Sequence, residues 1–185
     1  MKKSEELSMD TGAYLNSVFG LKGKVILITG AAGGIGNAIS RGNPLLEEIL
    51  SRGLAAAGGT VALCGRNLEK CRALMDEITA SGGTASAHRL DVADLDSIHA
   101  CVDEVAAQYG KIDVLFNIAG INKREGLLDV TPETYDRIMD TNLKGLFFVS
   151  QAVAREMYRY KSGNIVNIGS HNDTGMLGGC SVYGA

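Results

Sequence analysis

The feature that most constrains this chain is a short, fully apolar segment that runs directly into a cluster of glycines. Val25–Thr29 reads VILIT, and it is followed by Gly30, Gly33, Gly34 and Gly36. A short apolar run bounded by glycine is typical of a strand that is buried on both faces. Such a strand needs helices on both sides of its sheet, so the segment indicates an α/β architecture.

The same pattern recurs along the chain, with strand-like runs alternating with amphipathic segments of helical period. We expect further strands at Thr60–Cys64, Thr84–Arg89, Val114–Asn117 and Asn164–Ile168, and helices at Leu68–Ser81, Ser97–Tyr109 and from Thr131 to about Lys161. Thr131 and Pro132 suit the N-cap and first position of the last helix, in which we expect a kink near Asn142. Right-handed crossovers then give a doubly wound parallel sheet of the Rossmann type.

Composition excludes several other classes of protein. The chain has 185 residues with 18 basic and 21 acidic side chains and no long block of either charge, so we expect no nucleic-acid surface. No apolar run approaches the ~18 residues of a membrane span, and no apolar stretch follows the amino-terminal lysines as in a secretion signal. We expect a cytoplasmic location with reduced thiols and, because the cysteines and histidines lack ligand spacing, no metal.

The order of several short motifs carries more information than any one of them. Thr29–Gly36 reads TGAAGGIG between a strand and a helical pattern, Asp91 and Val92 follow the third strand, and Asn117–Gly120 reads NIAG after the fourth. Further along come Asn142 within TNLKG, Ser170 after the fifth strand, and Tyr183. This series resembles the classical short-chain dehydrogenase/reductase family from Leu21 to Ala185, with Ile118 in place of the usual second asparagine.

The resemblance implies a nicotinamide dinucleotide site at the carboxyl ends of the strands. It implies the following contacts: Gly30, Gly34, Ile35 and Gly36 around the pyrophosphate, Asp91 and Val92 at the adenine, and Asn117, Ala119 and Gly120 along the central channel. Glycine suits the first group because it lets a phosphate approach main-chain N–H groups. Asp91 has an alternative role, which is to cap the turn that follows it.

The end of the second strand bears on which cofactor is bound. A dehydrogenase that prefers NAD carries an acidic residue there, but this chain reads Cys64-Gly65-Arg66-Asn67. A guanidinium can hold a 2′-phosphate through two hydrogen bonds, so Arg66 favours NADP. Gly33 argues the other way, because many NADP-preferring members carry a second basic residue there, and NAD remains the alternative.

The resemblance also implies the chemistry, which is hydride transfer between an alcohol and a ketone, with a sugar, polyol or keto acid as candidate substrate. Tyr183 would be the acid/base, Ser170 would hold the substrate oxygen, and Asn142 would support a water relay. In the family a lysine four residues after the tyrosine lowers the pKa of the phenol from about 10. This chain ends at Ala185, so we expect severely impaired turnover, a sheet incomplete on its C-terminal side, and loss of the homo-oligomeric packing of a complete form.

Two segments depart from the family pattern. Residues 1–20 lack a clear period and predict a polar arm before a domain at 21–185. Deleting 43–53 joins GIGNAISRG to LAAAGG as the family's first helix, and the insertion ends in a second copy of Ser-Arg-Gly. Asn43 and Pro44 suit a helix start, which predicts a break and a restart with apolar residues Leu45, Leu46, Ile49 and Leu50 on one face. A non-catalytic nucleotide-binding or interaction module is therefore the alternative function.

Overall fold

The computed structural model describes residues 18–33, 46–170 and 178–185. Within these ranges the strands form one parallel sheet in the order β3-β2-β1-β4-β5. Their bounds are β1 Val25–Thr29, β2 Thr60–Gly65, β3 Thr84–Arg89, β4 Val114–Asn117 and β5 Asn164–Asn167. The predicted parallel α/β sheet is therefore confirmed.

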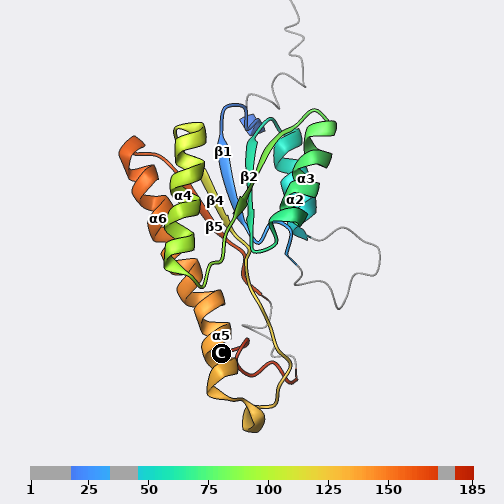
Figure 1. The fold of residues 1–185 in the computed structure, drawn as a ribbon, viewed down its shortest axis with the longest axis vertical. Coiled ribbons are helices and arrows are strands. Elements are labelled where there is room, and N and C mark those ends of the chain that lie inside the picture. The colour runs from blue at the N-terminus through green and yellow to red at the C-terminus, as the bar shows by residue number, and fades with distance from the viewer. Residues whose placement is uncertain (1–17, 34–45, 171–177) are drawn as a thin grey trace, which may run out of the picture.

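Helices cover both faces of this sheet. Figure 1 shows α2 and α3 packed on one side, and α4 and α6 on the other. The helices are α2 Leu46–Ala56, α3 Leu68–Ala80, α4 Leu95–Tyr109, α5 Pro132–Met139 and α6 Leu146–Tyr160, with a short 3₁₀ turn at Leu127–Asp129. Among the described residues, no helix is both long and apolar enough to cross a membrane.

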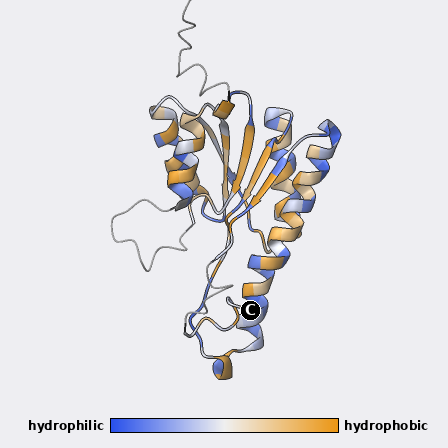
Figure 2. Ribbon diagram, turned by 180° about the vertical axis from the view of Figure 1, so that it is seen from behind, coloured by the Kyte–Doolittle hydropathy of each residue, from blue (hydrophilic) through white to orange (hydrophobic). Residues whose placement is uncertain are grey.

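The sheet divides the core into two apolar layers, and β1 contributes to both. Leu27 points into the layer under α4 and α6, where Val102 and Val153 are also buried. Ile26 and Ile28 point into the layer under α2 and α3. Figure 2 shows that the central strands are strongly apolar, as expected for strands enclosed on both sides. All four cysteines are described and buried, and none forms a disulfide.

The long helix predicted from Thr131 onward is interrupted near its middle. Its start is as predicted: the Thr131 side chain accepts a hydrogen bond from the Thr134 N–H and Pro132 takes the first position. A π-helical turn at Asp140–Gly145 then separates α5 from α6. The expected kink at Asn142 is confirmed, and such π turns are frequent at functional sites.

The insertion forms most of α2 rather than adding to it. The helix starts at Leu46, inside the inserted stretch, and a tight turn at Gly58 and Gly59 leads from its end to β2. A helix from Leu46 agrees with the predicted restart, whereas the predicted break and Leu45 fall in 34–45, outside the described residues. Ile49 is 54% exposed whereas Leu50 packs against the core, so these two residues do not share one apolar face.

Candidate active site

A cavity of about 270 Å³ opens at the carboxyl ends of the central strands. Six of the residues expected to bind the cofactor line it: Gly30, Arg66, Asp91, Val92, Ala119 and Gly120. Gly34, Ile35 and Gly36 lie outside the described residues. The fold therefore brings these six predicted residues to one cavity from four separate loops.

The floor of the cavity depends on a close approach between two loops. Gly30 has a φ of +72°, and a Cβ built there would lie 2.8 Å from the Ala119 Cα. The Thr29 hydroxyl accepts hydrogen bonds from the N–H groups of Ile118 and Ala119, both at 3.1 Å. Thr29 thus fixes the NIAG turn against the first strand, and the missing side chain of Gly30 makes room for it.

Asn117 supports the site from beneath and is not among the residues that line the cavity. It is buried, and its side-chain amide donates to the Ser150 hydroxyl at 2.8 Å and to the Asn167 side-chain oxygen at 2.9 Å. One amide therefore joins the end of β4 to α6 and to β5. Sequence predicted a position in the central channel, but not these partners, because they are distant along the chain.

Asp91 caps a turn and also lines the cavity. One of its carboxylate oxygens accepts a hydrogen bond from the Ala93 N–H at 3.1 Å, which is the turn-capping role. The residue also lines the cavity, and the second oxygen leaves capacity for a ligand. Next to it, the backbone of Val92 packs closely against Gly145 of the π turn. A Cβ on Gly145 would lie 2.5 Å from the Val92 carbonyl oxygen, so this contact requires glycine.

Two charged residues of the cavity were not anticipated from the sequence. Lys70, in the first turn of α3, lines it together with the exposed Arg66 four residues earlier. Glu47, in the first turn of α2, lines it as well, although it is only 5% exposed. The signal in the sequence was the presence of a second basic residue, Lys70, shortly after Arg66 and in the first turn of the following helix.

A thiol adds an uncharged part to the wall. Cys71 lines the cavity, and burial raises the pKa of its thiol despite a hydrogen bond from the Ala32 backbone that lowers it. Burial also raises the pKa of Cys64, reinforced by the neighbouring Cys101. These thiols are therefore protonated at neutral pH and behave as small apolar groups.

The three residues expected to act in catalysis do not line this cavity, as far as the described chain shows. Asn142 lies beside it, because its side chain pairs with the backbone of Ile121, a lining residue. The Ile121 N–H donates to the Asn142 side-chain oxygen at 2.8 Å, and the Asn142 amide donates back to the Ile121 carbonyl at 2.8 Å. Asn142 thus anchors the loop after NIAG, which sequence reasoning did not anticipate.

Ser170 and Tyr183 lie on segments near the sheet edge and the C-terminus. Ser170 is exposed just after β5, and Tyr183 is half-buried in a turn. That turn is attached to the loop after NIAG: the Glu125 N–H donates to the Gly179 carbonyl at 2.6 Å, and the Ser181 hydroxyl donates to the Glu125 carbonyl at 3.1 Å. Figure 1 shows the C-terminus beside α5, in agreement with this attachment.

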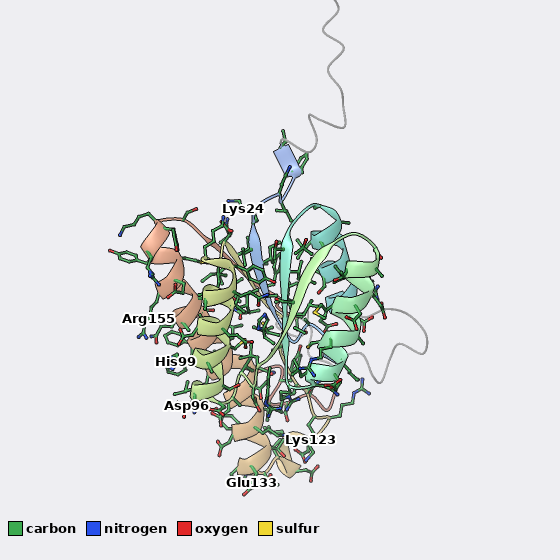
Figure 3. The ribbon with its side chains drawn as sticks, turned by 45° about the horizontal axis from the view of Figure 1, so that its top comes forward. Lys24, Asp96, His99, Lys123, Glu133 and Arg155 are labelled. Atoms are coloured by element: carbon green, nitrogen blue, oxygen red, sulfur yellow. The ribbon has the colours of Figure 1, made fainter. Side chains whose placement is uncertain are left out.

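The basic residues after NIAG are occupied in part by local contacts. The Lys123 ammonium pairs with the Glu125 carboxylate and donates to the Thr134 hydroxyl at 3.2 Å. The hydrogen bond from Lys123 holds the pKa of Glu125 below its usual value. In Figure 3 Lys123 and Glu133 lie at the end of the molecule opposite Lys24, whereas Asp96, His99 and Arg155 point outward from α4 and α6.

The sequence profile of the family described as short chain dehydrogenase matches residues 24–185. The chain belongs to the short-chain dehydrogenase family. Among curated relatives, it is 36% identical over 177 residues to a D-threitol dehydrogenase of Mycolicibacterium smegmatis, covering 94% of this chain and 60% of the relative. It is 37% identical over 147 residues to a 3-oxoacyl-acyl-carrier-protein reductase of Staphylococcus aureus, covering 80% of this chain and 56% of the relative.

Solved structures of short-chain dehydrogenases share the fold. A metagenomic short-chain oxidoreductase crystallised in complex with NADP superposes with a TM-score of 0.78 at 33% identity, over 89% of this chain and 70% of that one. The chain spans 60% of the length of the D-threitol dehydrogenase and 56% of the length of the 3-oxoacyl reductase. Family membership makes this an α/β protein of an oxidoreductase family, related to enzymes that act on alcohols and ketones.

Proposed function

We propose that this short-chain dehydrogenase binds NADP(H) in the cavity and belongs to an enzyme that interconverts an alcohol and a ketone. The observation that carries the proposal is the position of the cavity. In the sheet order β3-β2-β1-β4-β5, the chain leaves β1 toward β2 on one side and reaches β4 on the other. A parallel sheet of this kind binds nucleotides at that switch point, outside the carboxyl ends of its strands.

The residues of the cavity fit the adenosine half of the cofactor. Gly30 and Gly33 bring bare backbone to the cavity, and Arg66 and Lys70 supply positive charge for a phosphate. The volume of about 270 Å³ is slightly below the ~300–1,000 Å³ of small-molecule sites, which suits half of a dinucleotide. The complex with NADP of the metagenomic relative adds support for this cofactor over NAD.

In the proposed reaction each residue of the chain has a limited task. When bound, the nicotinamide ring would give or take the hydride. The Tyr183 phenol would carry the proton of the alcohol, and the Ser170 hydroxyl would hold the substrate oxygen. Asn142 would keep the loop at Ile121 in place through its paired hydrogen bonds.

The proposal names the class of substrate, which is a small polar alcohol or ketone. The D-threitol dehydrogenase acts, by its name, on a small polyol, which agrees with a sugar or polyol substrate. The 3-oxoacyl reductase acts, by its name, on a ketone. The substrates of the two relatives therefore share a carbon that is either an alcohol or a ketone.

The alternative, a non-catalytic nucleotide-binding or interaction module, predicts binding without turnover. Assembly of the enzyme as a homo-oligomer remains part of the proposal.

Binding of reduced cofactors to the 185-residue chain tests the proposal directly. We expect nicotinamide fluorescence titration to give a lower Kd for NADPH than for NADH. Arg66→Ala should weaken NADPH binding roughly tenfold or more, the effect of losing a charge-assisted contact, and leave NADH nearly unchanged. Arg72→Ala is the matched control, because Arg72 lies on α3, the helix that follows Arg66, and pairs with Glu69 outside the cavity. Failure to bind either cofactor would overturn the proposal.

A further inference from the structure

The inserted segment changes one specific position of the nucleotide site. The two copies of Ser-Arg-Gly lie at 40–42 and 51–53, an offset of eleven residues (51 − 40). In the structure the second copy, within α2, runs on into Leu54–Ala56. At the same offset, position 47 stands in the helix where Gly36 would stand if 43–53 were removed. By this sequence offset, Glu47 stands at the position in α2 for which the motif supplies its last glycine.

The side chain of Glu47 is enclosed by the site. Glu47 is 5% exposed and lines the cavity together with Gly30 and Gly33, the glycines of the first loop. The Ser51 hydroxyl donates to the Glu47 carbonyl at 2.6 Å, which braces the first turn of α2. Glu48, its neighbour, is half-buried and is not among the lining residues. The carboxylate thus has little access to water and little freedom to leave.

Among the described residues that line the cavity, positive and negative charges are equal in number. Arg66 and Lys70 contribute two positive charges, and Glu47 and Asp91 contribute two negative ones. The start of a helix is positively polarised and ordinarily attracts phosphate. A carboxylate in the first turn of α2 opposes that attraction, and in an enclosed site charges interact more strongly than in water.

We propose that Glu47 is an anionic specificity residue which weakens the binding of phosphate-bearing ligands to this cavity. The proposal rests on the function proposed above, since it concerns the same nucleotide site. Its consequence is that the penalty which Glu47 places on binding grows with the negative charge of the ligand, while Arg66 and Lys70 act in the opposite direction. The opposite role, in which the carboxylate accepts hydrogen bonds from ribose hydroxyls, predicts the opposite sign and is decided by the same experiment.

Isosteric substitution separates the charge of Glu47 from its shape. Glu47→Gln and the control Glu48→Gln are compared with the unsubstituted chain by calorimetric titration with adenosine, ADP and NADPH. We expect Glu47→Gln to tighten NADPH roughly tenfold, ADP by less, and adenosine not at all, because the repulsion scales with ligand charge. Glu48→Gln should change each Kd by less than about twofold, because Glu48 does not line the cavity. Thermal unfolding of both variants verifies that they fold.

Removal of residues 43–53 provides a second variant that does not depend on glutamine. It returns Gly36 to the start of the helix and should also tighten NADPH. An unchanged or weaker affinity of Glu47→Gln for NADPH, with normal binding by the unsubstituted chain, would overturn the role of Glu47 and leave the proposed function intact. Absence of NADPH binding in every variant would instead overturn the proposed function, and the role of Glu47 with it.

Discussion

The central strand β1 and the outer strand β5 have similar sequences and very different surroundings. VILIT in β1 is buried at all five residues, between β2 and β4 and under helices on both faces. NIVN in β5 is a parallel strand too, yet it is exposed at all residues except the half-buried Val166. The difference shows that burial is set by the neighbours of a strand in the sheet as much as by its own apolar residues.

The same contrast separates the two halves of the proposed site. Gly30 and Ala119, on the cavity side, follow strands of the buried centre. Ser170 follows the exposed β5, and Tyr183 lies on a turn attached to the loop at Glu125. The nucleotide half therefore rests on a packed scaffold within the described chain, whereas the residues proposed for catalysis lie on its periphery.

The largest expected effect tests whether β1 and β5 differ in stability as they differ in burial. Leu27→Ala should lower the free energy of unfolding by about 3–4 kcal/mol, because Leu27 is 0% exposed and the change leaves a cavity. Ile165→Ala should cost less than about 1 kcal/mol, because Ile165 is 39% exposed. Urea unfolding followed by circular dichroism measures both. Equal losses would show that β5 is as well enclosed as β1.

An intermediate effect is expected where the central strand meets the cavity. Gly30→Ala should lower stability by about 2–3 kcal/mol, since it adds both left-handed backbone strain and an overlap with Ala119. Gly82→Ala is the matched control: its φ is +84°, but no atom lies within 4 Å of the added Cβ. The control should cost only about 1 kcal/mol, the strain alone. The same unfolding assay would reject the close approach if both variants lost the same stability.

Sequence reasoning succeeded where the signal is local. The apolar run of β1, the Thr131 cap and the turn at Gly30 each carry their cause within a few residues, so their structure followed from the pattern. Glu47 and the partners of Asn117 escaped prediction, because they depend on which copy of Ser-Arg-Gly packs on the sheet and on contacts across tens of residues. Periodicity identifies the face of a helix, but it cannot tell which of two similar segments will occupy it.

The smallest expected effect concerns the end of the sheet away from the cavity, where Asp113 joins β1 to β5. Its carboxylate accepts a hydrogen bond from the Val25 N–H at 2.8 Å and pairs with Lys24 and Lys111, and its carbonyl accepts from the Asn164 N–H at 3.0 Å. Burial alone would raise the pKa of Asp113, but the Val25 hydrogen bond and the two ammonium groups outweigh it and hold that pKa below its usual value.

A carboxyl group with a lowered pKa stabilises the fold in its ionised form. Its contribution is complete above the unfolded pKa of about 3.9 and is lost as the pH falls through the lower folded value. Asp113→Asn should therefore reduce stability by about 1–2 kcal/mol at pH 7, and the difference in Tm from the unsubstituted chain should shrink below about pH 4. Asp103→Asn, on the exposed face of α4, is the control and should change Tm little at neutral pH. A difference for Asp113→Asn that persisted undiminished at pH 2 would mean that the side chain acts through its shape, and that charge does not contribute to joining the buried strand to the exposed one.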